Sequence, residues 1–108
     1  MTHLPPSEPI FYRVGDGTTW STERRFVAPA AVGPESYPYT LGVVADVGES
    51  ADANATMTHL LKAAPRIDSL IIAGDIAYAN GNGPVWDAFQ RMAEPVSSTN
   101  VWSVNAGK

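Results

Sequence analysis

The chain contains no cysteine, and only two of its 108 residues are histidine. The lack of cysteine excludes disulfide bonds, thiolate metal sites and cysteine nucleophiles. Basic residues are also scarce, since seven lysines and arginines stand against eleven aspartates and glutamates, for a net charge of −4. This balance provides no electrostatic reason to expect nucleic acid as a partner. No apolar run is long enough to cross a bilayer, so we expect no membrane-spanning segment.

Two further signals are missing. The first residues, MTHLPPSEPIFYRV, have prolines where a secretion signal needs an apolar core, so no signal peptide is recognisable. A phosphate-binding loop of the form G-x-x-x-x-G-K-S/T is absent as well. One sequon is present, Asn54-Ala55-Thr56, and it predicts glycosylation of Asn54 if the protein enters the secretory pathway.

The pattern changes near residue 37, and we predict one domain segment over residues 1–37 and another over 38–108. In the first, β-rich runs at 10–14 and 24–28 flank a turn signal, Gly15-Asp16-Gly17, which indicates a β-hairpin. Two strands alone are marginally stable in water. We therefore interpret the hairpin and the proline-rich stretch after it as the end of an all-β domain and its linker.

The second segment alternates between strand and helix patterns. Apolar runs over residues 39–45, 69–73 and 100–106 predict three strands, and the middle run is apolar on both faces, as buried parallel strands are. The 29 positions from Asp46 to Asp75 match the roughly 30 residues of a βαβ unit. We therefore predict an α/β fold with the order β-α-β-α-β.

Two helices are expected to connect these strands. The first, over residues 52–64, is capped by Ser50 or Asp52 and ended by Pro65. Its apolar face consists of Met57, Leu60, Leu61 and Ala64. The second helix stops at Pro95. Its apolar stripe consists of Val85, Trp86, Phe89 and Met92, of which the two aromatic residues are assigned to the core.

Two acids follow the first two strands of this unit. Asp46 and Asp75 each come directly after an apolar run, and adjacent parallel strands would bring their carboxylates side by side. Two like charges so placed persist only if a cation lies between them or one holds a proton. Oxygen ligands favour hard cations such as magnesium, manganese or ferric iron. Tyr78, three positions after Asp75, adds a phenol that suits a trivalent ion as phenolate.

Each of these residues also has a structural interpretation. Asp46 can cap a turn after its strand. Asp75 can be the acid of a Walker-B-like strand, and Tyr78 a tyrosine of the core or its rim. His59 lies within the first predicted helix and is interpreted as a surface residue.

Three segments taken in order resemble the purple acid phosphatases, the binuclear-metal branch of the calcineurin-like phosphoesterases. They are ADVG (45–48), GDIAY (74–78) and WDAFQRMAEP (86–95). The family pattern has an aspartate in D-x-G, then G-D-x-x-Y, then G-N-H-E/D, then two later histidine motifs. The resemblance covers residues 11–107. It implies a partial metallophosphoesterase sandwich of β-α-β-α-β order, preceded by the remnant of a fibronectin-III-like β-sandwich domain.

The resemblance also implies roles for single residues. Asp46 would ligate a ferric ion, Asp75 would bridge two metals, and Tyr78 would ligate the ferric ion as the phenolate that colours the family purple. The implied cofactor is a binuclear centre of Fe(III) with Fe, Zn or Mn, and the implied activity is hydrolysis of phosphate monoesters at acidic pH. The family is commonly secreted or vacuolar, which suits the sequon at Asn54.

The third motif departs from the family pattern. Gly107 matches the glycine of G-N-H-E/D, but Lys108 follows and the sequence ends. Neither His3 nor His59 matches a family position. We therefore expect an N-terminal fragment that is catalytically inactive or nearly so. Two other functions stay open: a non-enzymatic interaction module that pairs with a full-length partner, and a small phosphoacceptor or nucleotide-binding domain in which Asp46 is the functional acid.

Overall fold

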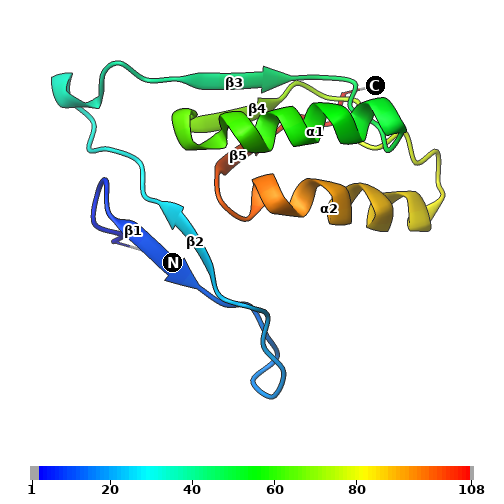
Figure 1. The fold of residues 1–108 in the computed structure, drawn as a ribbon, viewed down its shortest axis with the longest axis horizontal. Coiled ribbons are helices and arrows are strands. Elements are labelled where there is room, and N and C mark those ends of the chain that lie inside the picture. Colours follow the sequence, from blue (N-terminus) through cyan, green and yellow to red (C-terminus); the bar gives the residue numbers. More distant parts are fainter. Residues whose placement is uncertain (1–2, 108) are drawn as a thin grey trace.

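A computed structural model describes residues 3–107 of the chain, apart from the side chain of Glu35. The chain forms an antiparallel hairpin, followed by a three-stranded parallel sheet with two helices (Figure 1). The predicted α/β class, with a hairpin and then the order β-α-β-α-β, is therefore confirmed. Lys108, where the sequence departs from the family pattern, lies outside the described residues.

The hairpin pairs β1 (Pro9–Tyr12) with β2 (Arg24–Val27). Asp16 organises its long tip, because its carboxylate accepts hydrogen bonds from the backbone N–H groups of Thr18 and Thr19 at 2.9 and 2.7 Å. These bonds favour the ionised carboxylate and lower the pKa of Asp16. The turn chemistry of the sequence thus fixes the hairpin locally, although both strands are shorter than the runs suggested.

The parallel sheet has the order β3–β4–β5. Its strands are β3 (Leu41–Val44), β4 (Ser69–Ile72) and β5 (Val101–Val104), each shorter than predicted by one or two residues at an end. The central strand is β4, and its Leu70 and Ile72 side chains are fully buried. All three predicted strands are present, and the strand that is apolar on both faces is the central one.

The helix α1 (Ala51–Ala63) joins β3 to β4. Ser50 caps it, since its side-chain oxygen accepts the backbone N–H three residues further on at 3.2 Å. Met57 is buried as predicted. The prediction that Leu61 lies on the same buried face is wrong, because its side chain is 42% exposed. The reason is that Leu61 faces a cavity beside the hairpin instead of the sheet. The short 3-10 turn η2 (Ala64–Arg66) holds the proline expected to end the helix.

The helix α2 (Gly83–Ser97) joins β4 to β5. The predicted stop at Pro95 is wrong, because the helix continues for two residues beyond it. A proline clashes only with the turn before it and lacks only its own N–H, so later residues can remain helical. Accordingly, the N–H of Ser98 donates to the carbonyl of Glu94 at 2.9 Å. Because Pro95 has no N–H, it cannot donate to the carbonyl of Arg91 four residues earlier.

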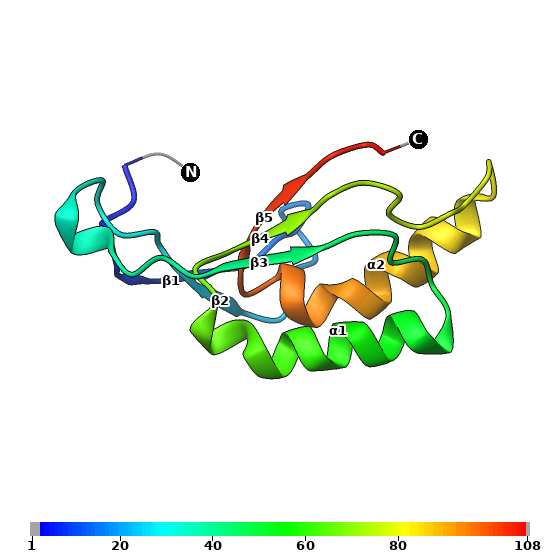
Figure 2. The ribbon, with the colours of Figure 1, turned by 90° about the horizontal axis from the view of Figure 1, so that it is seen from above.

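Both helices lie on the same face of the sheet (Figure 2). Two right-handed crossovers between sequential neighbouring strands require this arrangement. The buried cluster between sheet and helices consists of Met57, Ile72, Ala77, Ala79, Phe89 and Ala93. The assignment of Trp86 to the core is wrong, since this side chain is 42% exposed. It lies on the flank of α2 and meets the Phe89 ring edge to face at 6.3 Å.

The opposite face of the sheet has no helix over it (Figure 2). Leu41 and Val43 alternate with the residues that point toward the helices, and they are 48% and 59% exposed. Among residues 3–107, neither helix combines the length and hydrophobicity needed to cross a membrane.

Two polar contacts attach the hairpin to the end of α2. The Tyr12 hydroxyl donates to the carbonyl of Ser98 at 2.9 Å, and Arg24 forms an ion pair with Glu94. The hairpin therefore has its own connection to the α/β unit besides the linking chain. The domain boundary at residue 37 stays a prediction.

Candidate metal centre

Asp46 and Asp75 follow neighbouring strands, and their loops stay paired beyond the end of the sheet. The N–H of Asp46 donates to the carbonyl of Gly74 at 3.3 Å, and the N–H of Gly48 donates to the carbonyl of Ile76 at 2.8 Å. These bonds continue the pairing of β3 with β4. The structure thus brings both predicted acids to the carboxyl edge of the sheet, where α/β folds bind ligands.

Tyr78 lies on the loop after β4 and reaches across to the loop after β3. Its hydroxyl donates to Oδ1 of Asp46 at 2.5 Å. Its ring covers Gly48, where an added Cβ would lie 3.4 Å from the ring atom Cδ2. The main partner of Tyr78 is therefore the acid of the neighbouring strand. The three predicted site residues therefore form one group.

The carboxylates keep the Tyr78 phenol protonated. The pKa of Tyr78 is raised to about 12, mainly by the hydrogen bond to Asp46 and further by desolvation, the charges of Asp46 and Asp75 and a hydrogen bond to Asp75. A carboxylate accepts a hydrogen bond from the neutral phenol and repels the phenolate, so it favours the neutral form of the tyrosine. A cation placed among these groups would have the opposite effect, because it attracts the phenolate.

The backbone at this edge adopts a strained conformation. The φ angles of Asp46, Asp75 and Tyr78 are +53°, +47° and +52°, and Asn80 follows with +48°. This left-handed conformation costs a residue other than glycine about 1–2 kcal/mol. Between residues 3 and 107, six such residues have a positive φ, and four of them lie here. Strain of this kind gathers at functional sites, so its position supports the assignment of this edge as the site.

The remaining candidates from the sequence lie elsewhere. His59 is exposed on α1, and so is Asn54. The hydroxyl of Thr56, the third residue of the sequon, donates to the carbonyl of Asp52 at 3.0 Å within the helix. Glycosylation of Asn54 stays a prediction. In the described part of the chain, no group of three or more histidine, cysteine, aspartate or glutamate residues could hold a metal ion.

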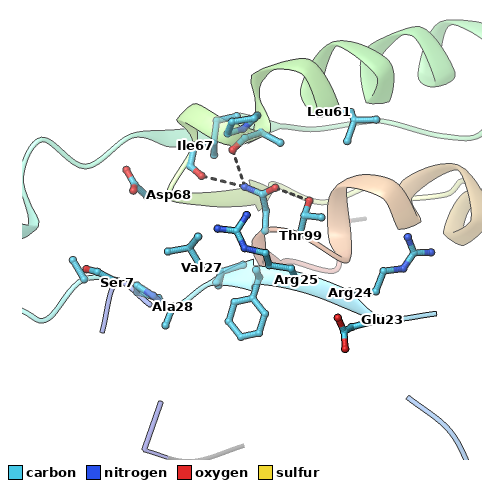
Figure 3. A pocket seen from close by; sticks show the side chains of 17 residues that line it. Ser7, Glu23, Arg24, Arg25, Val27, Ala28, Leu61, Ile67, Asp68 and Thr99 are labelled. Atoms are coloured by element: carbon cyan, nitrogen blue, oxygen red, sulfur yellow. Dashed lines mark hydrogen bonds between the residues drawn. The ribbon is translucent and has the colours of Figure 1, made fainter. Parts of the chain in front are cut away.

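A cavity of about 670 Å³ lies at the opposite end of the sheet, between β2 and the segments that precede β4 and β5 (Figure 3). Arg25 and Val27 of the hairpin extend toward its far wall, which includes Ile67. The Asn100 amide donates to the carbonyls of Ala64 and Ile67 at 3.2 and 3.1 Å, which ties the start of β5 to η2. None of the three predicted site residues lines this cavity.

Sequence reasoning missed one close contact at the site. Gly107 follows β5 and lies against Asp75, so that a Cβ added at Gly107 would be 2.1 Å from Oδ1 of Asp75. A signal was present in the sequence, because a glycine follows each of the three strands, at Gly48, Gly74 and Gly107. All three have a positive φ in the structure.

No protein-family model matches the chain. Similar proteins are nevertheless found over almost its whole length. It is 33% identical to probable purple acid phosphatase 20 of Arabidopsis thaliana over 96% of this chain, and 31% identical to Fe(3+)-Zn(2+) purple acid phosphatase 12 of the same plant over 90%. The solved structure of purple acid phosphatase PPD1 from yellow lupin (Lupinus luteus) seeds matches 96% of this chain, with a TM-score of 0.81 and 26% identity.

The chain is homologous to purple acid phosphatases over almost its whole length. It spans 23% and 21% of the lengths of the two Arabidopsis relatives and 21% of the lupin chain. It is therefore similar to about a fifth of a purple acid phosphatase, a part that includes the hairpin and the β-α-β-α-β unit.

The donors at the strand ends fit a hard cation. Asp46, Asp75 and Tyr78 offer two carboxylates and one phenol, and no thiolate or imidazole belongs to the group. Hard oxygen donors of this kind suit ferric iron. The name of one relative, a Fe(3+)-Zn(2+) purple acid phosphatase, includes that ion.

Proposed function

We propose that the chain carries part of the metal centre of an acid phosphatase that hydrolyses phosphate monoesters. In this proposal, Asp46 and Tyr78 hold a ferric ion, and Asp75 bridges it to a second ion, which is Fe, Zn or Mn. The observation that carries the proposal is the contact of the Tyr78 hydroxyl with Asp46 beside Asp75, at the ends of two adjacent parallel strands. The similarity of the chain to purple acid phosphatases supports the reaction class.

The three residues have distinct tasks in this proposal. A binuclear centre, when bound, supplies Lewis acidity toward the phosphate ester and lowers the pKa of a water molecule. Tyr78 must release its proton to solvent before its oxygen can serve as a ligand, and Asp46, which accepts the Tyr78 hydrogen bond, would then be free to ligate the same ion. Asp75 adds a second negative charge on the adjacent strand, which stabilises cations and repels the phenolate in their absence.

The finer architecture belongs to the same proposal. Residues 1–37 would be the end of a fibronectin-III-like β-sandwich domain, and residues 38–108 the first part of a metallophosphoesterase sandwich. The uncovered face at Leu41 and Val43 supports a second layer in the whole protein. A secreted or vacuolar location, with glycosylation at Asn54, is proposed from the family alone.

The activity of this chain is proposed to be negligible. The three oxygen donors do not form a closed site for two ions, and no histidine donor belongs to the group within residues 3–107. A chromogenic phosphomonoester assay with Fe(III) and Zn(II) should show no turnover above that of the Asp75→Asn variant. Titration with Fe(III) should produce a visible absorption band in the chain and none in Tyr78→Phe. Equal Fe(III) binding by the chain, Asp75→Asn and Asp46→Asn would overturn the proposed metal site.

A second candidate function is a non-enzymatic interaction module. The uncovered sheet face favours it, because Leu41, Val43 and Val101 expose apolar surface there. Sedimentation analysis distinguishes the two proposals. A chain that is folded and monomeric at micromolar concentration, and that binds Fe(III), contradicts the interaction module.

A further inference from the structure

Two glycines from different strand ends touch one another beside Asp75. Gly107 follows β5 and has a φ of +79°, while Gly74 precedes Asp75 and has a φ of +98°. A Cβ added at Gly74 would lie 2.6 Å from the Cα of Gly107. A Cβ added at Gly107 would lie 2.1 Å from Oδ1 and 2.2 Å from the backbone nitrogen of Asp75. The main chain after β5 therefore meets the main chain after β4 with no room for a side chain.

The atoms in this contact cannot easily give way. Packed carbon atoms attract each other best at about 3.5–4.0 Å, so both distances from the added Cβ are far inside contact. One obstacle is a backbone nitrogen, which no rotamer change can move. Asp75 itself is held in a left-handed conformation, and the N–H of Asn105 donates to the carbonyl of Ile72 at 3.1 Å, which keeps the two segments paired. A methyl group at Gly107 must shift either this pairing or the Asp75 carboxylate.

The Asp75 carboxylate also has a second neighbour, the side chain of Tyr78. Asp75 interacts with the Tyr78 hydroxyl, both through its charge and through a hydrogen bond. It is thus confined between the main chain of Gly107 and the phenol of Tyr78.

We propose that Gly107 is a positioning residue for Asp75. Its missing side chain lets the segment after β5 close over one side of the carboxylate, which holds the carboxylate in the group formed with Asp46 and Tyr78. This inference rests on the proposed function, in which Asp75 is a metal ligand, but it concerns a residue that supplies no ligand atom of its own. Gly74 is the residue on the loop after β4 that touches the main chain of Gly107.

The structure contains a matched control for this proposal. Gly81 has a φ of +84° and nothing within 4 Å of an added Cβ. Alanine at Gly81 therefore meets the same backbone strain as alanine at Gly107, without the collision. Any difference between the two variants measures the contact with Asp75 and not the left-handed conformation.

The test compares the full chain with Gly107→Ala, Gly81→Ala and Asp75→Asn, using Fe(III) supplied as its citrate complex. We expect Gly107→Ala to weaken Fe(III) binding by about 10- to 100-fold, the range seen when groups that orient a ligand are changed. The visible absorption band should also shift or weaken. Gly81→Ala should bind as the unchanged chain does. Circular dichroism should show the same helix content in all four proteins.

Several outcomes separate this inference from the proposed function. If Asp75→Asn binds weakly while Gly107→Ala binds as tightly as Gly81→Ala, the positioning role is wrong and the metal site stands. If Asp75→Asn binds as the unchanged chain does, the proposed function fails. In that case, amide NMR spectra without metal still decide the positioning role. Shifts at Asp75 and Tyr78 in Gly107→Ala, absent in Gly81→Ala, support it, and their absence overturns it.

Discussion

The hydroxyl of Tyr78 lies 2.5 Å from Oδ1 of Asp46, across the loops that follow two neighbouring parallel strands. The two residues are 32 positions apart in the sequence, so their contact depends on the pairing of β3 with β4. It joins a phenol to a carboxylate at the edge where Asp75 also lies. The resulting site is a set of oxygen donors that are linked by a hydrogen bond and are suited to bind a cation.

Asp46→Asn should lower the pKa of Tyr78 from about 12 toward the ordinary value of 10.0, because it removes the main group that favours the neutral phenol. NMR of tyrosine labelled with ¹³C at the Cζ position resolves this titration. Asp52→Asn, at an exposed position on α1, is the control and should leave Tyr78 unchanged. Since the folded-state pKa is raised, the contribution of this pair to stability is present below pH 10 and is lost as the pH rises to about 12. An unaltered Tyr78 titration in Asp46→Asn would contradict the contact.

Fe(III) binding should strengthen with rising pH, because the ion must displace the proton of Tyr78. We expect about one more proton released for each ion bound by the unchanged chain than by Tyr78→Phe. Calorimetry in buffers of different ionisation enthalpy measures this number. Tyr39→Phe is the matched control, since Tyr39 is an exposed tyrosine outside the site. Equal proton release from Tyr78→Phe and the unchanged chain would show that the phenol is not a ligand.

Pro95→Ala should stabilise the chain. The substitution restores an N–H to the last turn of α2 and gives the Arg91 carbonyl a partner, which is worth about 1–3 kcal/mol in a helix. Urea unfolding followed by circular dichroism measures the free energy of unfolding. Pro84→Ala is the control, because a proline in the first turn of a helix removes no hydrogen bond. A loss of stability in Pro95→Ala would mean that the helix does not extend to Ser97.

Ser50→Ala should lower the free energy of unfolding by about 1 kcal/mol, since it removes the side-chain acceptor that caps α1. Ser50→Asp keeps an acceptor at the same position and should retain most of the stability. The same unfolding experiment checks both variants. Equal losses in the two would indicate that the cap contributes nothing.

The uncovered apolar face of the sheet predicts self-association of the chain at high concentration. Val43→Lys should reduce it, because Val43 lies on this face and is 59% exposed. Sedimentation velocity over a range of concentrations detects the change. Thr58→Lys adds the same charge on the exposed side of α1 and should have a smaller effect. If both variants behave alike, the effect comes from net charge and not from the sheet face.

Much of the fold could be predicted because its signals are local. The alternation of apolar runs with helical spacing yielded the α/β class, and the capping role of Ser50 needed only neighbouring residues. The errors have both local and non-local causes. A proline was expected to stop α2, although Pro95 disrupts only the turn before it. Leu61 and Trp86 have the spacing of core residues, but exposure depends on which elements cover them, and spacing contains no information about that.

The sequence by itself determined which chemical groups follow the strands, namely Asp46, Asp75 and Tyr78, and that parallel strands would bring them to one edge. Only the tertiary structure decided that Tyr78 bonds to Asp46 and that Gly107 closes against Asp75. These contacts join segments about 30 residues apart, and their distances depend on strand register and the left-handed turns after each strand. A local pattern can place a group at the end of a strand. Its partner is set by the packing of the strands.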